Sequence, residues 1–141
     1  MSDYVLDANV IMSMLISGKA NYRELTTVFR FVTIDFVFDE IRKYKDVIAI
    51  RSAKSPPELQ HFTEFIFAQL TVLPDFILQE DTLLKATKLC TGIDLKDVSY
   101  VALSLQLNLP LLTRDKPLTD GLRQKGFRDV MLFNDFLKRM I

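Results

Sequence analysis

Hydrophobic positions along the chain fall into short continuous runs and longer stretches with helical spacing. The short runs predict buried strands at 4–6, 31–34, 71–73, 110–113 and 130–133. The stretches with a spacing of three or four residues predict helices at 10–16, 22–30, 36–51, 58–70, 79–90, 97–108 and 118–125, with an amphipathic tail from residue 134. Pro56, Gly92 and Gly126 fall between these segments. Strands that alternate with helices predict an α/β fold, in which helices cover both faces of a parallel sheet.

Length and composition favour one domain. The chain has 141 residues and is 49% hydrophobic, so we expect a single domain over residues 1–141 with one core. Its 18 Lys and Arg residues balance its 18 Asp and Glu residues. This balance excludes a positive field over the whole surface, so any contact with nucleic acid must be local. With no basic leader and no apolar segment near the roughly 20 residues that span a bilayer, we expect a soluble cytoplasmic protein.

The chain has a single cysteine and a single histidine, which limits the kinds of metal site and catalytic mechanism that are possible. Cys90 cannot form an internal disulfide, and beside Leu89 it is expected to be a buried, inert thiol. His61 is expected to be structural or at the surface. Without a Cys/His cluster a zinc site is not supported. Catalysis by a paired general acid and base near neutral pH commonly uses His, so that route is also disfavoured.

Two acids stand where predicted strands end. Asp7 directly follows the run 4–6, with Asn9 two residues further on, and Asp115 follows the run 110–113. Ligands of parallel α/β sheets bind at the carboxyl ends of the strands, so these acids are candidates for a functional site. Two alternatives stay open, namely that Asp7 or Asn9 caps the next helix and that Asp115 is a turn residue.

The predicted helix 36–51 carries two adjacent acids on different faces. Its apolar stripe is formed by Val37, Ile41, Tyr44 and Ile48. Each helical residue advances by about 100°, which places Glu40 about 60° from the centre of this stripe and Asp39 on nearly the opposite face. Glu40 is therefore the acid expected to turn inward, and Asp39 is expected to be a solvated surface charge.

Two more acids precede the last long helix. Asp94 and Asp97 are three residues apart, and in a continuous helical turn they would share one face. Asp94 is equally well explained as a helix cap, whereas for Asp97 we favour a functional role.

Converging carboxylates repel one another unless a divalent cation neutralises them. All the candidate ligands are oxygen donors, which favours Mg²⁺ or Mn²⁺. A water activated by such a metal can attack a phosphodiester. There is no Gly-rich loop with Lys-Ser/Thr, so nucleotide hydrolysis of that kind is not supported.

Four segments carry a resemblance to a known family: Val5-Leu6-Asp7-Ala8-Asn9, Glu40-Ile41, Asp94 to Leu103, and Leu112 to Asp115. Together they resemble the PIN domain, and the D-x-x-D-V-x-Y-V-A-L stretch followed by T-x-D is the most specific part. The resemblance implies a three-layer α/β/α sandwich with a parallel sheet of about five strands. It also implies a Mg²⁺- or Mn²⁺-dependent endoribonuclease that cuts single-stranded RNA, and a homodimer. Many small prokaryotic members are VapC-like toxins that an antitoxin protein inhibits.

The resemblance also assigns site residues. It implies a catalytic, metal-binding quartet formed by Asp7, Glu40, Asp97 and Asp115. Supporting polar positions are Asn9 and Thr113, and Asp94 matches an extra acid that only a subset of members has.

Contact with RNA through basic side chains is a further hypothesis. The candidates are Arg42, Lys43 and Lys45, from a basic cluster that also contains Arg51 and Lys54, together with Arg114. The simpler explanation of the cluster is a solvated helix face.

Two rival functions stay open. One is a non-catalytic PIN fold that acts as a binding or assembly module, with Phe62, Phe65 and Phe67 on a dimer or partner surface. The other is a different Asp-based metal-dependent phosphohydrolase, although Asn9 stands where a phosphatase of the haloacid dehalogenase type needs a second Asp.

Overall fold

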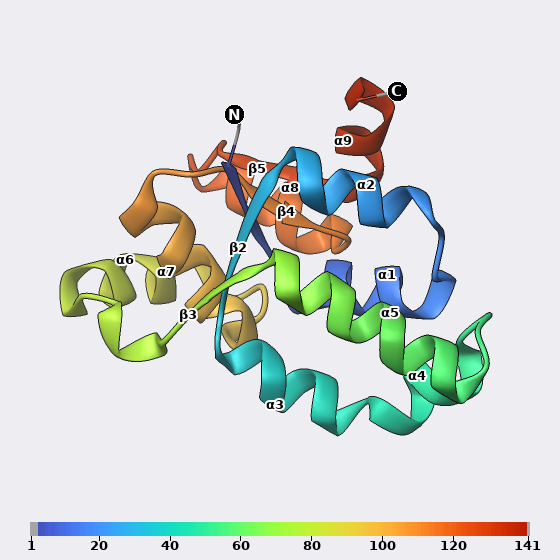
Figure 1. Ribbon diagram of the computed structural model, residues 1–141. Coiled ribbons are helices and arrows are strands. Elements are labelled where there is room, and N and C mark those ends of the chain that lie inside the picture. The colour runs from blue at the N-terminus through green and yellow to red at the C-terminus, as the bar shows by residue number, and fades with distance from the viewer. Residues whose placement is uncertain (1–2, 141) are drawn as a thin grey trace.

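A computed structural model describes residues 3–140 of the chain (Figure 1). The strands are β1 (Asp3–Leu6), β2 (Arg30–Ile34), β3 (Thr71–Leu73), β4 (Leu111–Thr113) and β5 (Val130–Leu132). The α-helices are α1 (Ala8–Ser17), α2 (Asn21–Val28), α3 (Phe36–Lys43), α4 (Lys45–Arg51), α5 (Pro56–Gln69), α6 (Glu80–Cys90), α7 (Val98–Leu107), α8 (Lys116–Gln124) and α9 (Phe133–Met140). Two 3₁₀ turns, η1 (Asp75–Ile77) and η2 (Leu95–Asp97), precede α6 and α7. The alternation of strands and helices predicted from the hydrophobic pattern is confirmed.

The five strands form one parallel sheet in the order β3-β2-β1-β4-β5. β1 lies at its centre, pairing with β2 on one side and β4 on the other. The chain runs outward from β1 to β3 and then returns past β1 to β4, so the connections reverse direction between β1 and β4. In parallel α/β sheets the ligand site lies at the carboxyl ends of the strands at such a reversal. The end of β1 is therefore the place in this fold where a site is expected.

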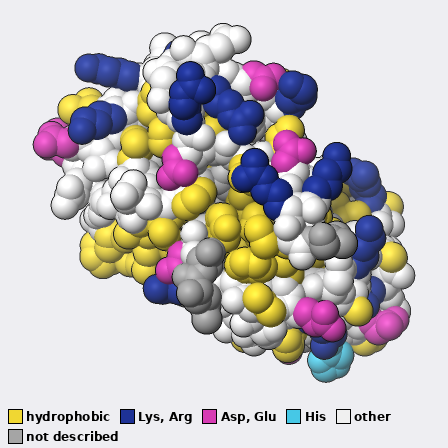
Figure 2. Space-filling view, turned by 90° about the horizontal axis from the view of Figure 1, so that it is seen from above, with side chains coloured by type: hydrophobic (Ala, Val, Ile, Leu, Met, Phe, Trp, Pro, Cys, Tyr) yellow, Lys and Arg dark blue, Asp and Glu magenta, His cyan; other side chains and the backbone are white. Residues whose placement is uncertain are grey.

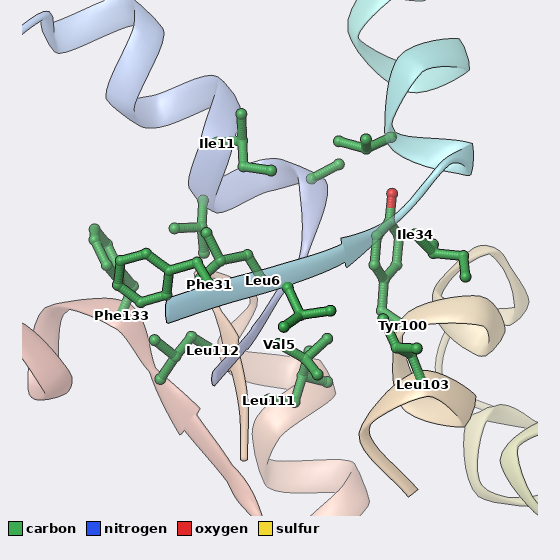
Figure 3. Close-up of a cluster of buried hydrophobic side chains, with 14 of the residues drawn as sticks. Val5, Leu6, Ile11, Phe31, Ile34, Tyr100, Leu103, Leu111, Leu112 and Phe133 are labelled. Carbon is green, nitrogen blue, oxygen red and sulfur yellow. The ribbon is translucent and has the colours of Figure 1, made fainter. Parts of the chain in front are cut away.

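Helices cover both faces of the sheet. α7 packs against β1, β2 and β4 on one face together with α6 and α8, and α1, α2, α5 and α9 lie on the other (Figure 1). Ile11 of α1 and Leu103 of α7 approach the strands from opposite sides in Figure 3, with the buried β1 residues Val5 and Leu6 between them. Because both faces of β1 are covered, its run Tyr4 to Leu6 is continuously apolar rather than alternating.

An aromatic cluster joins the first strands to the last helix. Tyr4, Phe29 and Phe31 surround Phe136 of α9, and the Tyr4 and Phe136 ring centroids are 4.8 Å apart in an edge-on arrangement. Phe133 also stacks on Phe136 at 6.0 Å. These edge-to-face and stacked contacts add to the hydrophobic burial that holds α9 on the sheet.

The segment 36–51, predicted as one helix, is two helices that meet at Tyr44. The backbone of Tyr44 has φ −105° and ψ 14°, which ends α3 before α4 begins. No Pro or Gly lies in this segment, so the break has no local cause. α3 and α4 each pack against α1, and Ile48 of α4 is buried. Tertiary packing on α1 therefore divides a stretch whose local pattern predicts a single helix.

The predicted helix 97–108 also begins differently. The chain enters through the 3₁₀ turn η2, and the α-helical part starts at Val98. Asp94 is extended, with φ −160°, so it does not share a helical face with Asp97. The two acids approach each other because η2 folds Asp94 back, and not because of helical phase.

The surface is mixed in charge. In the view from above, Lys and Arg side chains are interspersed with hydrophobic and acidic ones over the visible face (Figure 2). Among the described residues no helix is both long enough and apolar enough to cross a membrane.

Candidate metal centre and cleft

Asp7 is placed at the carboxyl end of β1 and is held there by two hydrogen bonds. The Thr113 hydroxyl donates to its Oδ2 at 2.8 Å, and the Asn9 backbone N–H donates to its Oδ1 at 3.3 Å. The side chain is 3% exposed. Desolvation raises the pKa of Asp7 to about 6, against these two hydrogen bonds, which lower it. Asp7 thus caps α1, which was one of the two alternatives, and also faces the site.

Thr113 and Asn9 join the ends of β1 and β4. Thr113 Oγ1 accepts hydrogen bonds from the Asn9 side-chain amide at 3.3 Å and from the Asp115 backbone N–H at 3.1 Å. Asn9 Oδ1 accepts from the Arg114 backbone N–H at 3.1 Å. These bonds fix the position of Asp115 relative to Asp7, although the two acids are far apart in the sequence. Thr113 and Asn9 therefore lie where the resemblance places its supporting polar residues.

Asp94 and Asp115 are both helix caps and members of an acidic cluster. Asp94 Oδ1 accepts from the Lys96 backbone N–H at 3.1 Å, and Asp115 Oδ1 accepts from the Leu118 backbone N–H at 3.0 Å. Carboxylate oxygens of Asp94, Asp97 and Asp115 all lie within 4.8 Å of one another. Lys96 Nζ lies 3.5 Å from Asp94 Oδ2 at the edge of the cluster. Capping and convergence on one site are compatible for these residues.

Asp97 differs from the other acids because its buried oxygen accepts no hydrogen bond and because burial and the surrounding acids outweigh the favourable charge of Lys96. It is 4% exposed, and its Oδ2 is buried with no hydrogen-bond partner in residues 3–140. Desolvation is the largest cause that raises the pKa of Asp97, to about 8, and the charges of Asp7, Asp94 and Asp115 raise it further. A buried carboxylate without a partner is costly unless a cation neutralises it.

Glu40 reaches the site from α3 and is held by Tyr100 of α7. The Tyr100 hydroxyl donates to Glu40 Oε1 at 2.9 Å. Figure 3 shows the Tyr100 ring within the core and its oxygen turned toward α3. Burial is the largest cause that raises the pKa of Glu40, and the Tyr100 hydrogen bond and Lys96 oppose it. The neighbouring Asp39 is exposed and lies 3.7 Å from Arg42, as helical phase predicted.

The donor set fits a hard divalent cation. Every candidate ligand is a carboxylate oxygen, which Mg²⁺ and Mn²⁺ favour over nitrogen or sulfur. Ligand oxygens of an octahedral ion with bonds near 2.1 Å are about 3.0 Å apart when adjacent and about 4.2 Å apart when opposite. The carboxylate oxygens of Asp94, Asp97 and Asp115 lie within 4.8 Å of one another, so side-chain movements that draw them closer would let all three bind one ion. The unpartnered Asp97 Oδ2 is the atom with most to gain from a bound cation.

The acids lie at one end of a cleft with a volume of about 880 Å³. Its acidic end is lined by Asp7, Glu40, Asp97 and Asp115. The exposed face of α1 runs along the cleft, the α3–α4 pair contributes residues from Glu40 to Arg51, and α9 contributes Asn134 and Leu137. Four basic residues also line it: Lys19, Arg51, Lys96 and Arg114. The cleft can therefore accept a polyanion and bring it to the acidic cluster.

A family model described as PIN domain matches residues 5–133, which is most of the chain. The chain belongs to the PIN domain family. The resemblance inferred from the sequence motifs is thereby confirmed. PIN domains are generally nucleases, so membership of the family supports a hydrolase that acts on nucleic acids. No curated protein matches the sequence significantly.

Solved structures with the same fold include three from prokaryotes. PAE2754 from Pyrobaculum aerophilum is 17% identical with a TM-score of 0.68, covering 98% of this chain and 88% of that one. A toxin-antitoxin complex from Klebsiella pneumoniae is 12% identical with a TM-score of 0.58, covering 91% and 95%. VapBC2 from Rickettsia felis, bound to a DNA fragment from its promoter, is 15% identical with a TM-score of 0.56, covering 92% and 96%. At these identities the likeness establishes the PIN fold.

Several expectations about individual side chains can be compared with the geometry of this PIN domain. Cys90 is buried, and burial raises the pKa of its thiol to about 11, as expected for an inert thiol. His61 is exposed. The expectation that Phe62 lies on a partner surface is wrong, because Phe62 is fully buried in the core. Phe65 and Phe67 are half-buried and pack against that core.

The basic residues suggested for RNA contact are distributed unevenly. Arg114 lines the cleft, whereas Arg42, Lys43 and Lys45 are exposed and are not among the described residues that line it. Lys19 and Lys96, which the sequence did not single out, do line it. Lys96 directly precedes Asp97, and this position next to a predicted metal ligand could have identified it as a cleft residue.

Tyr100 is a second site residue that motif reasoning quoted without giving it a role. A tyrosine inside an otherwise apolar, buried helix needs a partner for its hydroxyl. Tyr100 is also three residues after Asp97, on the same side of the helix start. These two facts were sufficient to predict that its hydroxyl points toward the acids.

Proposed function

We propose that this PIN domain is a Mg²⁺- or Mn²⁺-dependent endoribonuclease that hydrolyses single-stranded RNA. The observation that carries the proposal is the buried Asp97 carboxylate, whose Oδ2 has no partner in the described structure and lies in a cluster of acids beside a basic-lined cleft. RNA is chosen over DNA because of the family resemblance. A PIN fold that served only for binding or assembly would have no need of this unstable arrangement of charge.

The acidic side chains have different roles in the proposed hydrolysis. Asp94, Asp97 and Asp115 would hold a divalent ion, which when bound supplies a water of lowered pKa and neutralises charge on the phosphate. Asp7, with a pKa near 6, is ionised at neutral pH and can accept the proton of the attacking water. Tyr100 orients Glu40 toward the same end of the cleft, where Glu40 would contribute a further carboxylate to the metal site.

The positive side chains at the acidic end act on the substrate. Lys96 and Arg114 are exposed at the lining of the cleft, where they can contact the non-bridging oxygens of the phosphate. Water adds to phosphorus, the bond to the leaving ribose oxygen breaks, and a proton ends on that oxygen. The products are one strand ending in a phosphate monoester and another ending in a hydroxyl.

A test of catalysis uses a 5′-labelled single-stranded oligoribonucleotide with purified protein and Mn²⁺ or Mg²⁺. We expect internal cleavage that EDTA abolishes, and we expect Asp7→Asn and Asp97→Asn each to reduce it by at least 100-fold, the scale on which loss of a catalytic group acts. Asp39→Asn is the matched control, since Asp39 is exposed on the opposite face of α3. Cleavage that persists in the doubly substituted protein would come from a contaminant and would overturn the proposal.

We further propose that this enzyme is the toxin of a toxin-antitoxin pair, inhibited by an antitoxin protein. Two of the structures that share this fold are a toxin-antitoxin complex and VapBC2. Expression of the wild-type chain should then arrest growth, expression of Asp97→Asn should not, and co-expression of an adjacent small gene should relieve the arrest. Unimpaired growth despite RNA cleavage in vitro would contradict the toxin role alone. The homodimer that the family resemblance implies stays a prediction.

A further inference from the structure

The cleft has a second charged region away from the acids. Lys19, just beyond the end of α1, and Arg51, the last residue of α4, are both exposed and both line the cleft. Neither forms a salt bridge with any side chain in residues 3–140, unlike Arg30, Arg42, Lys96 and Lys116. Their positive charges are therefore available to a ligand.

These two cations are brought together by contacts between the ends of α1 and α4. The Ala53 backbone N–H donates to the Ile16 carbonyl oxygen at 3.1 Å, which ties the segment after α4 to the last turn of α1. Gly18 ends α1 in the left-handed region, with φ 60°, and a Cβ there would lie 2.7 Å from Lys54 Cε. This close approach holds Lys19 and Arg51 at one corner of the cleft.

Apolar side chains also line the cleft. Met12 and Ile16 of α1 and Val47 of α4 are among them. Tyr44, at the junction of α3 and α4, is 37% exposed and also lines the cleft. An exposed aromatic ring beside apolar side chains can stack on unpaired bases without reading their sequence.

The length of α1 separates the basic corner from the acidic end. Asn9, beside Asp7, and Ser17, beside Gly18, both line the cleft on the exposed face of α1. At 1.5 Å per residue these positions are about 12 Å apart along the helix axis. Neighbouring bases in a stacked strand rise by only about 3.4 Å. A strand that reached from the acids to the basic corner would therefore span several nucleotides.

We propose that Lys19 and Arg51 form a subsite for a backbone phosphate of single-stranded nucleic acid, several nucleotides away from the bond that is cut, with Tyr44 stacking on a base between. This inference rests on the proposed function. It adds that an RNA must be several nucleotides long to contact both the acids and the basic subsite. Binding energy from this remote contact would be used to hold the scissile phosphate against the acids.

The test compares Lys19→Ala/Arg51→Ala with a matched double variant, Lys85→Ala/Arg128→Ala, which removes the same charge from exposed positions outside the cleft lining. Binding of a fluorescent twelve-nucleotide RNA is measured by polarisation in the Asp97→Asn background, which separates binding from cleavage. We expect roughly 10- to 30-fold weaker binding for the cleft variant and a salt dependence reduced by about two ions. The control should change neither.

Substrate length provides the second readout. In the active protein, the cleft variant should raise KM for the long RNA with little change in kcat, and its effect on a trinucleotide should be smaller. Tyr44→Ala should weaken binding of the long RNA by about tenfold, and Tyr44→Phe, which keeps the ring, should restore it.

Three results would overturn the subsite. The first is an equal loss of binding in the control variant, and the second is an equal effect of the cleft variant on long and short RNA. The third is unchanged RNA binding in the Lys19→Ala/Arg51→Ala variant, which is expected if the cleft binds a protein segment instead. Absence of cleavage, with binding that still depends on Lys19 and Arg51, would instead count against the proposed function and support the subsite.

Discussion

Asp97 is the acid whose position contributes nothing to the stability of the folded chain. Asp7, Asp94 and Asp115 each accept a backbone hydrogen bond near the start of a helix, so part of the cost of placing them is offset by capping. Asp97 makes no such bond and lies among three other carboxylates. Residues held at a net cost to stability are characteristic of functional sites.

Replacing Asp97 should therefore separate stability from activity. Asp97→Asn removes the buried charge while keeping the shape of the side chain. At pH 8 in EDTA we expect its thermal midpoint to rise by about 2–4 °C, equivalent to roughly 1 kcal/mol for a chain of this size. RNA cleavage should be lost in the same variant. A lower midpoint at pH 8 would show that Asp97 is stabilised by a contact not identified in the fold.

Tyr100 is expected to act through Glu40 and not on the substrate. Tyr100→Phe keeps the buried ring and removes only the hydroxyl that donates to Glu40 Oε1. We expect a loss of about 1 kcal/mol of stability, together with weaker Mn²⁺ binding measured by calorimetry on the metal-free protein. A purely structural role would lower stability but leave the Mn²⁺ affinity unchanged.

For single residues, the sequence predicted those features that depend on position along one element. Strand ends placed Asp7 and Asp115, and helical phase separated Glu40 from Asp39. The hydrogen bond between Tyr100 and Glu40 was not predicted, because that bond depends on how α7 and α3 are arranged around the sheet.

Among the elements, α8 is packed closely against the turn that leads into Asp94. A Cβ added at Gly121 would lie 2.5 Å from Ile93 Cδ1 and 2.9 Å from Ile93 Cγ1. Glycine inside a helix normally costs about 1 kcal/mol relative to alanine. Its presence in α8 is explained by this approach, because an added methyl group would force the Ile93 side chain to shift.

Gly121→Ala should therefore destabilise the protein despite its better helix propensity. We expect a loss of about 1–3 kcal/mol in urea unfolding, as for overpacking of a core, and weaker Mn²⁺ binding because the turn before Asp94 is displaced. Adding Ile93→Val, which removes the nearest methyl group, should recover part of both losses. A stabilising Gly121→Ala would show that the turn yields freely.

The local sequence pattern determines whether a segment forms a helix or a strand, but it does not determine where a helix is interrupted. Apolar spacing predicted every strand and the position of nearly every helix. The break at Tyr44 and the 3₁₀ entry at Leu95–Asp97 arise from packing on α1 and from capping by Asp94. Both breaks shape the site, since Tyr44 lines the cleft and η2 brings Asp94 to Asp97.

Over the whole molecule, the acidic cluster links stability to pH and to metal. The folded pKa values of Asp7 and Asp97, about 6 and about 8, lie above their ordinary value of 3.8. The folded state therefore holds these protons more tightly than the unfolded chain. This contribution to stability is complete below about pH 4 and is lost as the pH rises toward 8.

Thermal melts in EDTA should show a midpoint that falls between about pH 5 and 8, and saturating Mn²⁺ or Mg²⁺ should reverse the fall, since it stabilises the ionised acids. In EDTA, the thermal midpoint of the Asp97→Asn variant should change less with pH than that of the wild type. A midpoint in EDTA that rises over the same range would contradict the assignment of raised pKa values to this cluster.

The layered α/β/α architecture was accessible from sequence because a continuously apolar strand implies a sheet covered on both faces. The strand order was not predicted, and the number of strands was implied by the family resemblance. Hydrophobic pattern does not determine which strands pair, because pairing depends on contacts between residues distant in the chain. The cleft, which is lined by α1, α3, α4 and α9, is a further product of that arrangement.

The bond between Thr113 and Asp7 joins residues separated by 106 positions, and the one between Tyr100 and Glu40 spans 60. A ribosome must therefore complete most of this chain before the acids can meet. A nascent chain that has not yet emerged as far as β4 has an incomplete central sheet and lacks Asp115. The acidic site would then be complete only late in synthesis.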